Sequence, residues 1–252
     1  MRTRRHLAAG ADLADGAVAS GRGGLTEFGE NLWIADGPDI RGAAGFQFPT
    51  RMAIIRLADG GLFIWSPIAL DPGLRKAVDT LGPVRFLIAP NRLHHVFLAD
   101  WMQAYPDAIA HGAPGLAEKR GDIRFHAILG DTALPDWCDE IDQVLLDNRI
   151  TPEIVFFHRP SRTVLFTDLL QQMPRDYYSG WRRVVARLDL MTGRQASVPR
   201  KFRLGFANRK AARAAIGRIL AWPLEQVVMA HGIPVRENAS AVLRRAFAWL
   251  RV

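Results

Sequence analysis

Two adjacent histidines, His94 and His95, follow an apolar run that has the composition of a buried β-strand. The run covers residues 84–89 and ends at Pro90, and a helix-like pattern begins directly after the histidines. Loops at the carboxyl ends of strands are where α/β folds place their ligands. The pair is therefore either a set of metal ligands or two ordinary polar loop residues, and the local sequence leaves both interpretations open.

Two later strand ends carry further potential ligands. Asp168 directly follows the apolar run 163–167, and His231 and Gly232 follow the run 224–230. Carboxylate and imidazole groups are common ligands of zinc and iron. The alternative for Asp168 is an N-cap of the helix that follows, and for His231 it is a buried histidine bonded to a backbone carbonyl. Because one ion would need several of these residues, the assignments depend on one another.

Two more polar residues lie at the ends of a neighbouring predicted strand. His158 ends the apolar run 153–158, and we assign it a structural role. Glu153 begins the same run and is either a carboxylate that supports the ligands from behind or an exposed residue at a strand start.

Length and composition favour one large folded unit. The chain has 252 residues, of which 49% are hydrophobic, and this is enough to bury a sizeable core. There is one cysteine, Cys138, so an intrachain disulfide framework is excluded and a reducing, cytoplasmic setting is expected. We expect a single domain over residues 25–252.

The N-terminal segment is basic over residues 1–6, which raises the question of a targeting peptide. The residues that follow are rich in alanine and glycine and include Asp12 and Asp15, so an apolar core of a signal peptide is lacking. No apolar run approaches the roughly 20 residues of a membrane span. Residues 1–24 are therefore expected to form a flexible extension.

The net charge of +8 is concentrated in one part of the chain. Residues 175–218 contain twelve Lys or Arg against Asp176 and Asp189. The segment lacks the interleaved aromatics and motifs of nucleic-acid-binding proteins, so no nucleic-acid partner is expected. A solvated helical face is the favoured interpretation, and peripheral contact with a membrane or another anion is the alternative.

Strand-like and helix-like segments occur in two rounds, roughly 25–120 and 140–252. Strands are predicted at 32–34, 52–57, 62–65, 84–89, 108–110, 141–146, 153–158, 163–167 and 224–230. Helices are predicted at 72–81, 96–105, 113–119, 177–190, 208–220 and 237–250. The strands lack strict polar alternation, as expected where both faces of a sheet are covered.

Four stretches of this pattern resemble the DUF4336 family, a divergent branch of the metallo-β-lactamase-like superfamily. They are 60–67 (GGLFIWSP), 89–95 (APNRLHH), 157–168 (FHRPSRTVLFTD) and 230–232 (AHG). The resemblance covers about residues 25–252 and implies an α/β fold, a four-layer αββα sandwich with ligand loops at the strand ends.

The superfamily's main motif, His-x-His-x-Asp-His, is altered here. Aligned by its strand, the motif places Pro90 and Arg92 at its first two histidines, His94 at its aspartate and His95 at its last histidine. The superfamily's middle histidine falls within 148–152, where the chain has none. The resemblance therefore implies that the first metal position is lost.

The second metal position of the superfamily is retained in altered form. Its ligands would be His94, His95, Asp168 and His231. Three imidazoles and one carboxylate suit one divalent ion, zinc or iron. Arg92 would bring positive charge close to the vacated position, which argues against a second cation.

The resemblance implies a metal-dependent hydrolase of a small molecule. Asp168 would serve as ligand and proton acceptor, and Arg92 would stabilise a developing anion or bind an anionic substrate, unless it forms a structural salt bridge. Two alternatives stay open. The chain is either a non-catalytic or metal-free scaffold, or a non-haem iron oxidoreductase.

Overall fold

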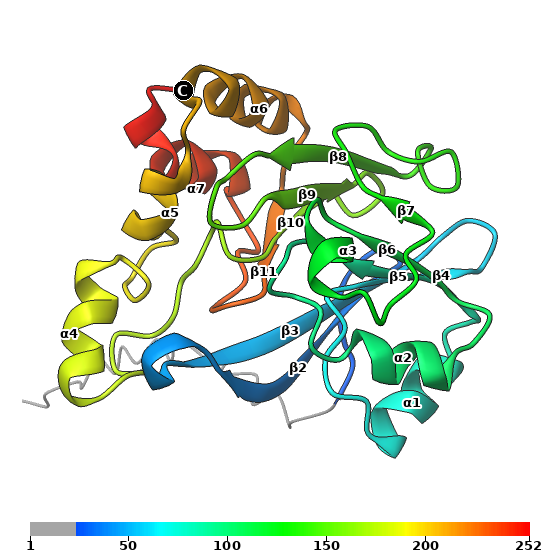
Figure 1. Cartoon of the computed structure of the whole chain (residues 1–252). Helices are drawn as coiled ribbons and strands as arrows, with labels where there is room; N and C mark the ends of the chain where they lie inside the picture. Colours follow the sequence, from blue (N-terminus) through cyan, green and yellow to red (C-terminus); the bar gives the residue numbers. More distant parts are fainter. Residues whose placement is uncertain (1–23) are drawn as a thin grey trace, which may run out of the picture.

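The computed structural model describes residues 24–252 and contains two β-sheets with helices on their outer sides (Figure 1). All but the last residue of the extension expected at 1–24 lies outside the described residues. None of the helices within 24–252 has the length and apolar character needed to cross a membrane.

The first sheet has seven strands in the order β1-β2-β3-β4-β5-β6-β7. They are β1 (Thr26–Gly29), β2 (Leu32–Arg41), β3 (Gln47–Arg56), β4 (Leu62–Trp65), β5 (Val84–Ala89), β6 (Ile109–Gly112) and β7 (Ala127–Ile128). Strands β1 to β4 are antiparallel neighbours, and β4 to β7 run parallel. Asp59 and Gly60, which suit a tight turn, join β3 to β4, and Gly60 has the positive φ (84°) that such a turn requires.

The second sheet has four strands in the order β11-β10-β9-β8. They are β8 (Ile141–Leu146), β9 (Glu153–His158), β10 (Thr163–Phe166) and β11 (Gln226–Met229). Strands β8, β9 and β10 are antiparallel, whereas β10 and β11 are parallel, with Phe166 opposite Met229. The carboxyl ends of β10 and β11 therefore lie side by side.

The α-helices lie outside the two sheets. They are α1 (Pro72–Asp79), α2 (Leu98–Ala104), α3 (Leu116–Lys119), α4 (Gly180–Leu188), α5 (Arg200–Gly205), α6 (Arg209–Ala221) and α7 (Ala239–Ala246). Buried residues of α1, α2 and α3 pack on the outer face of the first sheet, and those of α5, α6 and α7 pack on the outer face of the second. Between the sheets lies a third apolar cluster.

This arrangement confirms the predicted four-layer αββα sandwich. Neighbouring strand residues belong to different layers: Ile55 and Phe63 lie in the cluster between the sheets, while Ile54 and Ile64 lie under the helices. Both sides of the central strands are thus buried, which explains their continuous apolar sequence. In the middle layer, Phe63 packs edge-to-face on Phe156 of the other sheet, with ring centroids 5.4 Å apart.

Side-chain caps begin two of the helices. The Asp71 side chain accepts a hydrogen bond from the Leu74 backbone N–H at the start of α1, and Asn208 caps α6 through Ala211 in the same way. The sequence did not indicate the strands β1 and β7 or the helix α5. Helix α4 is shorter than the predicted 177–190, and Ala186 is its one buried residue.

The contact between the sheets provides a test of the packing. Replacing the fully buried Phe156 with alanine should lower the free energy of unfolding by about 3–5 kcal/mol, because the ring's contacts with both sheets are lost and a cavity remains. Urea unfolding followed by circular dichroism measures the change. Ile128→Ala is a matched control at a side chain that is 45% exposed. Equal losses in the two variants would contradict the proposed packing.

Candidate metal centre

Three of the residues predicted as ligands converge at one end of the sandwich. Nε2 of His94 lies 3.3 Å from Oδ2 of Asp168, and Nε2 of His231 lies 3.5 Å from Oδ1 of the same carboxylate. The potential ligand atoms of all three residues lie within 4.8 Å of one another. Their side chains are 7%, 7% and 4% exposed for His94, Asp168 and His231, so the group is shielded from bulk water.

Strand register explains how these residues meet. Asp168 lies two residues beyond the end of β10, and His231 lies two residues beyond the end of β11. Because Phe166 pairs with Met229 in the parallel ladder, Asp168 and His231 emerge at the same level. His94 comes from the other sheet, on the loop after β5. The Pro90 carbonyl accepts a hydrogen bond from the Ile154 backbone N–H, and this contact joins the two sheets at the site.

The second ring nitrogen of each histidine has a partner that fixes the ring. Nδ1 of His231 lies 2.7 Å from the Pro49 carbonyl oxygen, and Nδ1 of His94 lies 2.7 Å from the Ser66 hydroxyl. A carbonyl can only accept, so Nδ1 of His231 carries a hydrogen. In the neutral ring Nε2 then presents a lone pair toward the Asp168 carboxylate, which is also an acceptor. The two groups can face each other only if a cation, either a metal ion or an added proton, lies between them.

Electrostatics sets the charge of two members of the group. Burial lowers the pKa of His94, although its hydrogen bond with Asp168 and the charge of Asp168 act in the opposite direction. Burial alone would raise the pKa of Asp168, but hydrogen bonds with His231 and His94 hold the pKa well below its ordinary value. A neutral imidazole and an ionised carboxylate are the forms that bind a metal.

Asn91 connects the histidine loop to Asp168. Its Oδ1 accepts hydrogen bonds from the backbone N–H groups of Leu93 and His94, while Nδ2 donates to Asp168 Oδ2 at 2.7 Å and to Thr167 Oγ1 at 2.8 Å. One buried amide therefore shapes the turn and orients the carboxylate. The sequence indicated Asn91 only as a turn residue.

Glu153 is a carboxylate that supports the ligand loop from behind. It is fully buried, and its oxygens accept hydrogen bonds from the backbone N–H groups of Thr167, Asp168 and Leu169. Burial, together with the charge of Asp168, raises the pKa of Glu153 to about 7. The supporting role is therefore observed, and the exposed alternative for Glu153 is wrong.

Arg51 holds the loop that carries His231. This buried side chain of β3 bonds Asp36 through Nε at 2.7 Å and donates from Nη1 to the carbonyl oxygens of Met229 and Gly232, at 2.8 and 2.5 Å. Gly232 has a φ of 122°, and a Cβ there would collide with the backbone of Gln172. The sequence did not single out Arg51, and its partners are too distant along the chain for any motif to show them.

The structure places His95 and Arg92 outside this group. Nδ1 of His95 lies 2.9 Å from Nη1 of Arg120 and so accepts its hydrogen bond. Burial, followed by the charges of Lys119 and Arg120, lowers the pKa of His95 to about 4. The Arg92 guanidinium donates to the carbonyl oxygen of Ile150 at 2.9 Å. Of the four predicted ligands, the fold thus brings together three.

His158 and the segment 148–152 have structural contacts. His158 is buried, and its Nδ1 lies 2.8 Å from the Ser161 hydroxyl, in line with its predicted role. In 148–152, Asn148 donates to the Phe202 carbonyl oxygen, and Thr151 accepts from the Arg92 backbone. Neither segment contributes to the three-residue group.

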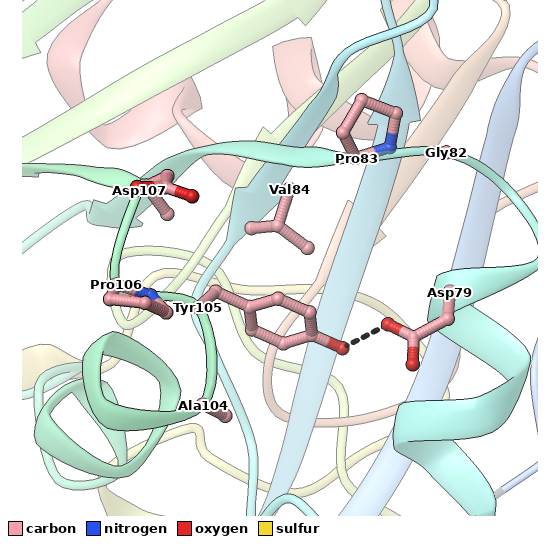
Figure 2. A pocket seen from close by; sticks show the side chains of 9 residues that line it. Asp79, Gly82, Pro83, Val84, Ala104, Tyr105, Pro106 and Asp107 are labelled. Atoms are coloured by element: carbon pink, nitrogen blue, oxygen red, sulfur yellow. Dashed lines mark hydrogen bonds between the residues drawn. The ribbon is translucent and has the colours of Figure 1, made fainter.

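A separate hollow of about 520 Å³ lies at the opposite end of β5 (Figure 2). Its walls include Val84, the first residue of β5, whereas His94 follows the last. There the Tyr105 hydroxyl donates to Asp79 Oδ1 at 2.9 Å, and burial with this bond raises the pKa of Tyr105. The hollow contains no second set of metal-ligating side chains among the residues that the structure describes.

Comparison with solved structures defines the class of fold. The structure is similar to VMB-1, with a TM-score of 0.60 and 7% identity over 90% of this chain and 96% of that one. It is also similar to the metallo-β-lactamase DIM-1 (TM-score 0.59, 12% identity, 90% and 95% covered). A third is FIM-1 from Pseudomonas aeruginosa in its mono-zinc form (TM-score 0.56, 12% identity, 88% and 93% covered). The fold is that of the metallo-β-lactamases.

The sequence comparison defines the family. The profile of the domain of unknown function DUF4336 matches residues 30–179, more than half of the chain, and the chain belongs to this family. His94 and Asp168 lie inside the matched region, and His231 lies beyond it. No curated protein matches the sequence significantly.

The raised pKa of Glu153 predicts how its replacement depends on pH. The folded-state value of about 7 lies above the ordinary 4.5, so the Glu153 proton contributes stability that is complete below pH 4.5 and is lost as the pH rises through 7. Glu153→Gln cannot ionise and cannot accept all three N–H bonds. We expect the variant to have a lower free energy of unfolding than the wild type at pH 5. This difference should shrink by about 2–3 kcal/mol by pH 8.

Urea unfolding of chelator-treated wild-type and Glu153→Gln protein at several pH values measures this difference. The same exchange at the exposed Glu237 reports the effect of removing one surface carboxylate. If the difference in free energy of unfolding between the wild type and Glu153→Gln stays constant or grows between pH 5 and 8, Glu153 is ionised throughout this range.

Proposed function

We propose that the protein is a metal-dependent hydrolase with a mononuclear centre held by His94, Asp168 and His231. One observation carries the proposal. His231 donates from Nδ1 to a backbone carbonyl and turns Nε2 toward an ionised carboxylate, an arrangement that calls for a cation between two acceptors. Hydrogen bonds from a ligand's other ring nitrogen to a backbone carbonyl are typical of metal-binding histidines.

The donor set fits zinc or iron. Zinc binds imidazole nitrogen at about 2.0–2.1 Å and carboxylate oxygen at about 2.0–2.2 Å, so ligand atoms on one ion lie roughly 3–4 Å apart. The Nε2-to-oxygen distances of 3.3 and 3.5 Å agree with this spacing. Three protein ligands with a free fourth position are the pattern of catalytic zinc, whereas structural zinc has four protein ligands.

The metal and the protein contribute differently to the proposed chemistry. A bound ion supplies Lewis acidity and lowers the pKa of a water toward neutrality. Asp168 supplies the negative charge of the site, and Asn91 and Glu153 fix its position. Arg92 would reach an anionic substrate only after its guanidinium leaves the Ile150 carbonyl, so its role in anion binding stays a prediction.

A second candidate function is a non-haem iron oxidoreductase. The observation that favours it is the composition of the group, since two histidines and one carboxylate form the ligand set of many non-haem iron oxygenases. The identity of the bound metal and a requirement for oxygen separate this candidate from a hydrolase. A metal-free scaffold, in which a proton replaces the ion, predicts no bound metal at all.

Metal content tests the three-residue site. Protein purified without chelators should contain about one zinc or iron per chain by elemental analysis. His94→Ala and His231→Ala should lose at least 90% of the metal, because two protein ligands hold an ion roughly 10–100-fold or more less tightly. His95→Ala is the matched control and should retain it. Retention of metal in both ligand variants, or its loss in His95→Ala alone, would contradict the three-residue site.

Hydrolysis of chromogenic esters, thioesters and phosphodiesters tests the reaction class. The wild type should hydrolyse at least one class, chelation should abolish the activity, and added metal should restore it. Asp168→Asn should lower kcat/KM by about 100-fold or more, because an amide neither neutralises the ion nor accepts a proton. Equal activity in the wild type and Asp168→Asn would exclude this centre as the catalyst.

A further inference from the structure

Helix α4 turns an apolar stripe toward solvent. Its members are Trp181, Val184, Val185 and Leu188, whose exposed fractions are 54%, 60%, 41% and 60%. Their spacing of three, one and three residues places them on one face of a helix. In most surface helices such a face packs on the core, but in α4 only Ala186 is buried. A contiguous exposed apolar stripe marks an interaction site.

The helix is fixed in this orientation. Arg182 donates from Nε and Nη2 to the carbonyl oxygen of Ala44, at 3.2 and 3.1 Å, and the Phe46 ring meets Trp181 edge-on with centroids 5.6 Å apart. Figure 1 shows α4 at the outer edge of the molecule, away from the layer formed by α6 and α7. The apolar stripe is therefore presented by a rigid element at the periphery.

The other faces of α4 carry positive charge. Helix α4 contains Arg182, Arg183 and Arg187 and no acidic residue, and Arg183 and Arg187 form no ion pair within residues 24–252. The start of the helix borders a polar cavity of about 340 Å³ whose walls include Arg41 and Arg182.

Helix α5, which follows α4 along the chain, is also basic and exposes an apolar side chain. Helix α5 is connected to the end of α4 through Asp189, whose backbone and side-chain oxygens accept from the N–H groups of Arg200 and Lys201. It adds basic residues and Leu204, which is 80% exposed. Six of the twelve basic residues of 175–218 therefore lie on these two helices.

We propose that α4 is a docking surface for an anionic lipid membrane. An interfacial helix that combines an apolar stripe containing tryptophan with arginines on its flanks lies in the plane of the membrane surface. The stripe would enter the boundary between headgroups and acyl chains, and the arginines would meet the lipid phosphates. The charge selects an anionic bilayer over a neutral apolar partner. This inference stands independently of the metal centre.

Vesicle binding by the full chain tests the proposal. The fraction of protein that cosediments is measured with phosphatidylcholine vesicles and with vesicles that also contain about 30% phosphatidylglycerol, at low and at high salt. The wild type should bind the anionic vesicles, and salt should weaken the binding. Trp181→Ser/Leu188→Ser should weaken it by about tenfold or more. Arg183→Glu/Arg187→Glu should weaken it by about thirtyfold or more, because the reversal removes two positive charges and adds two negative ones.

Two controls match these changes elsewhere on the surface. Ile128→Ser removes an exposed apolar side chain on β7, and Arg244→Glu/Arg245→Glu reverses two exposed charges on α7. Thermal unfolding confirms that each variant is folded. Wild-type binding that both α4 variants lose and both controls keep supports the proposal.

Three results would overturn it. The first is an absence of wild-type binding to anionic vesicles at low salt. The second is equal binding by the α4 variants and their controls. The third comes from light scattering coupled to size exclusion: a wild-type dimer that Trp181→Ser/Leu188→Ser converts to a monomer would assign the stripe to a second copy of the chain.

Discussion

The Asp168 carboxylate, buried between two imidazoles, is the interaction on which the surrounding structure depends. A buried charge is costly unless it is paired and hydrogen-bonded. Here His94, His231 and the Asn91 amide all face it, and Glu153 binds its backbone from the other side. These contacts join loops from both sheets, so the site and the junction between the sheets are one structure. Loss of any one partner would leave the charge less compensated.

The loop after β5 takes part both in the candidate site and in the contact between the two sheets. Pro90 and Arg92, which the resemblance aligns with two histidines of the superfamily's motif, both make structural contacts. The Pro90 carbonyl accepts a bond from β9, and the Arg92 guanidinium holds the Ile150 carbonyl. His94, which the same resemblance aligns with the motif's aspartate, places its ring beside Asp168. This part of the loop is thus a packed junction, while His94 brings its ring nitrogen together with Asp168 and His231.

Helix α4 contains part of the basic segment 175–218 and places it on the surface. A run of arginines in a sequence is most often a solvated face, and that was the favoured interpretation for 175–218. In the fold, the apolar residues of α4 also lie on the surface, on the same helix as three of those arginines. The helix is anchored to Ala44 by Arg182, and its single buried residue is Ala186. Charge and exposed apolar surface thus coincide on one rigid helix, far along the chain from His94 and separate from the ligand loops.

The sequence by itself determined most of the strands and helices and the strand ends that carry His94, Asp168 and His231, because apolar runs and turn residues act over a few neighbouring positions. The four-layer arrangement was implied by the resemblance to a known family and not by these local patterns. It could not determine which of two adjacent histidines turns inward. That choice depends on Asn91, which shapes the loop, and on Arg120, 25 residues away, which binds the His95 ring. Pro49 is likewise 182 positions from His231, and only tertiary packing brings such partners together. Tertiary packing also determines that the α4 stripe faces solvent, because helical periodicity defines an apolar face but does not specify what covers it.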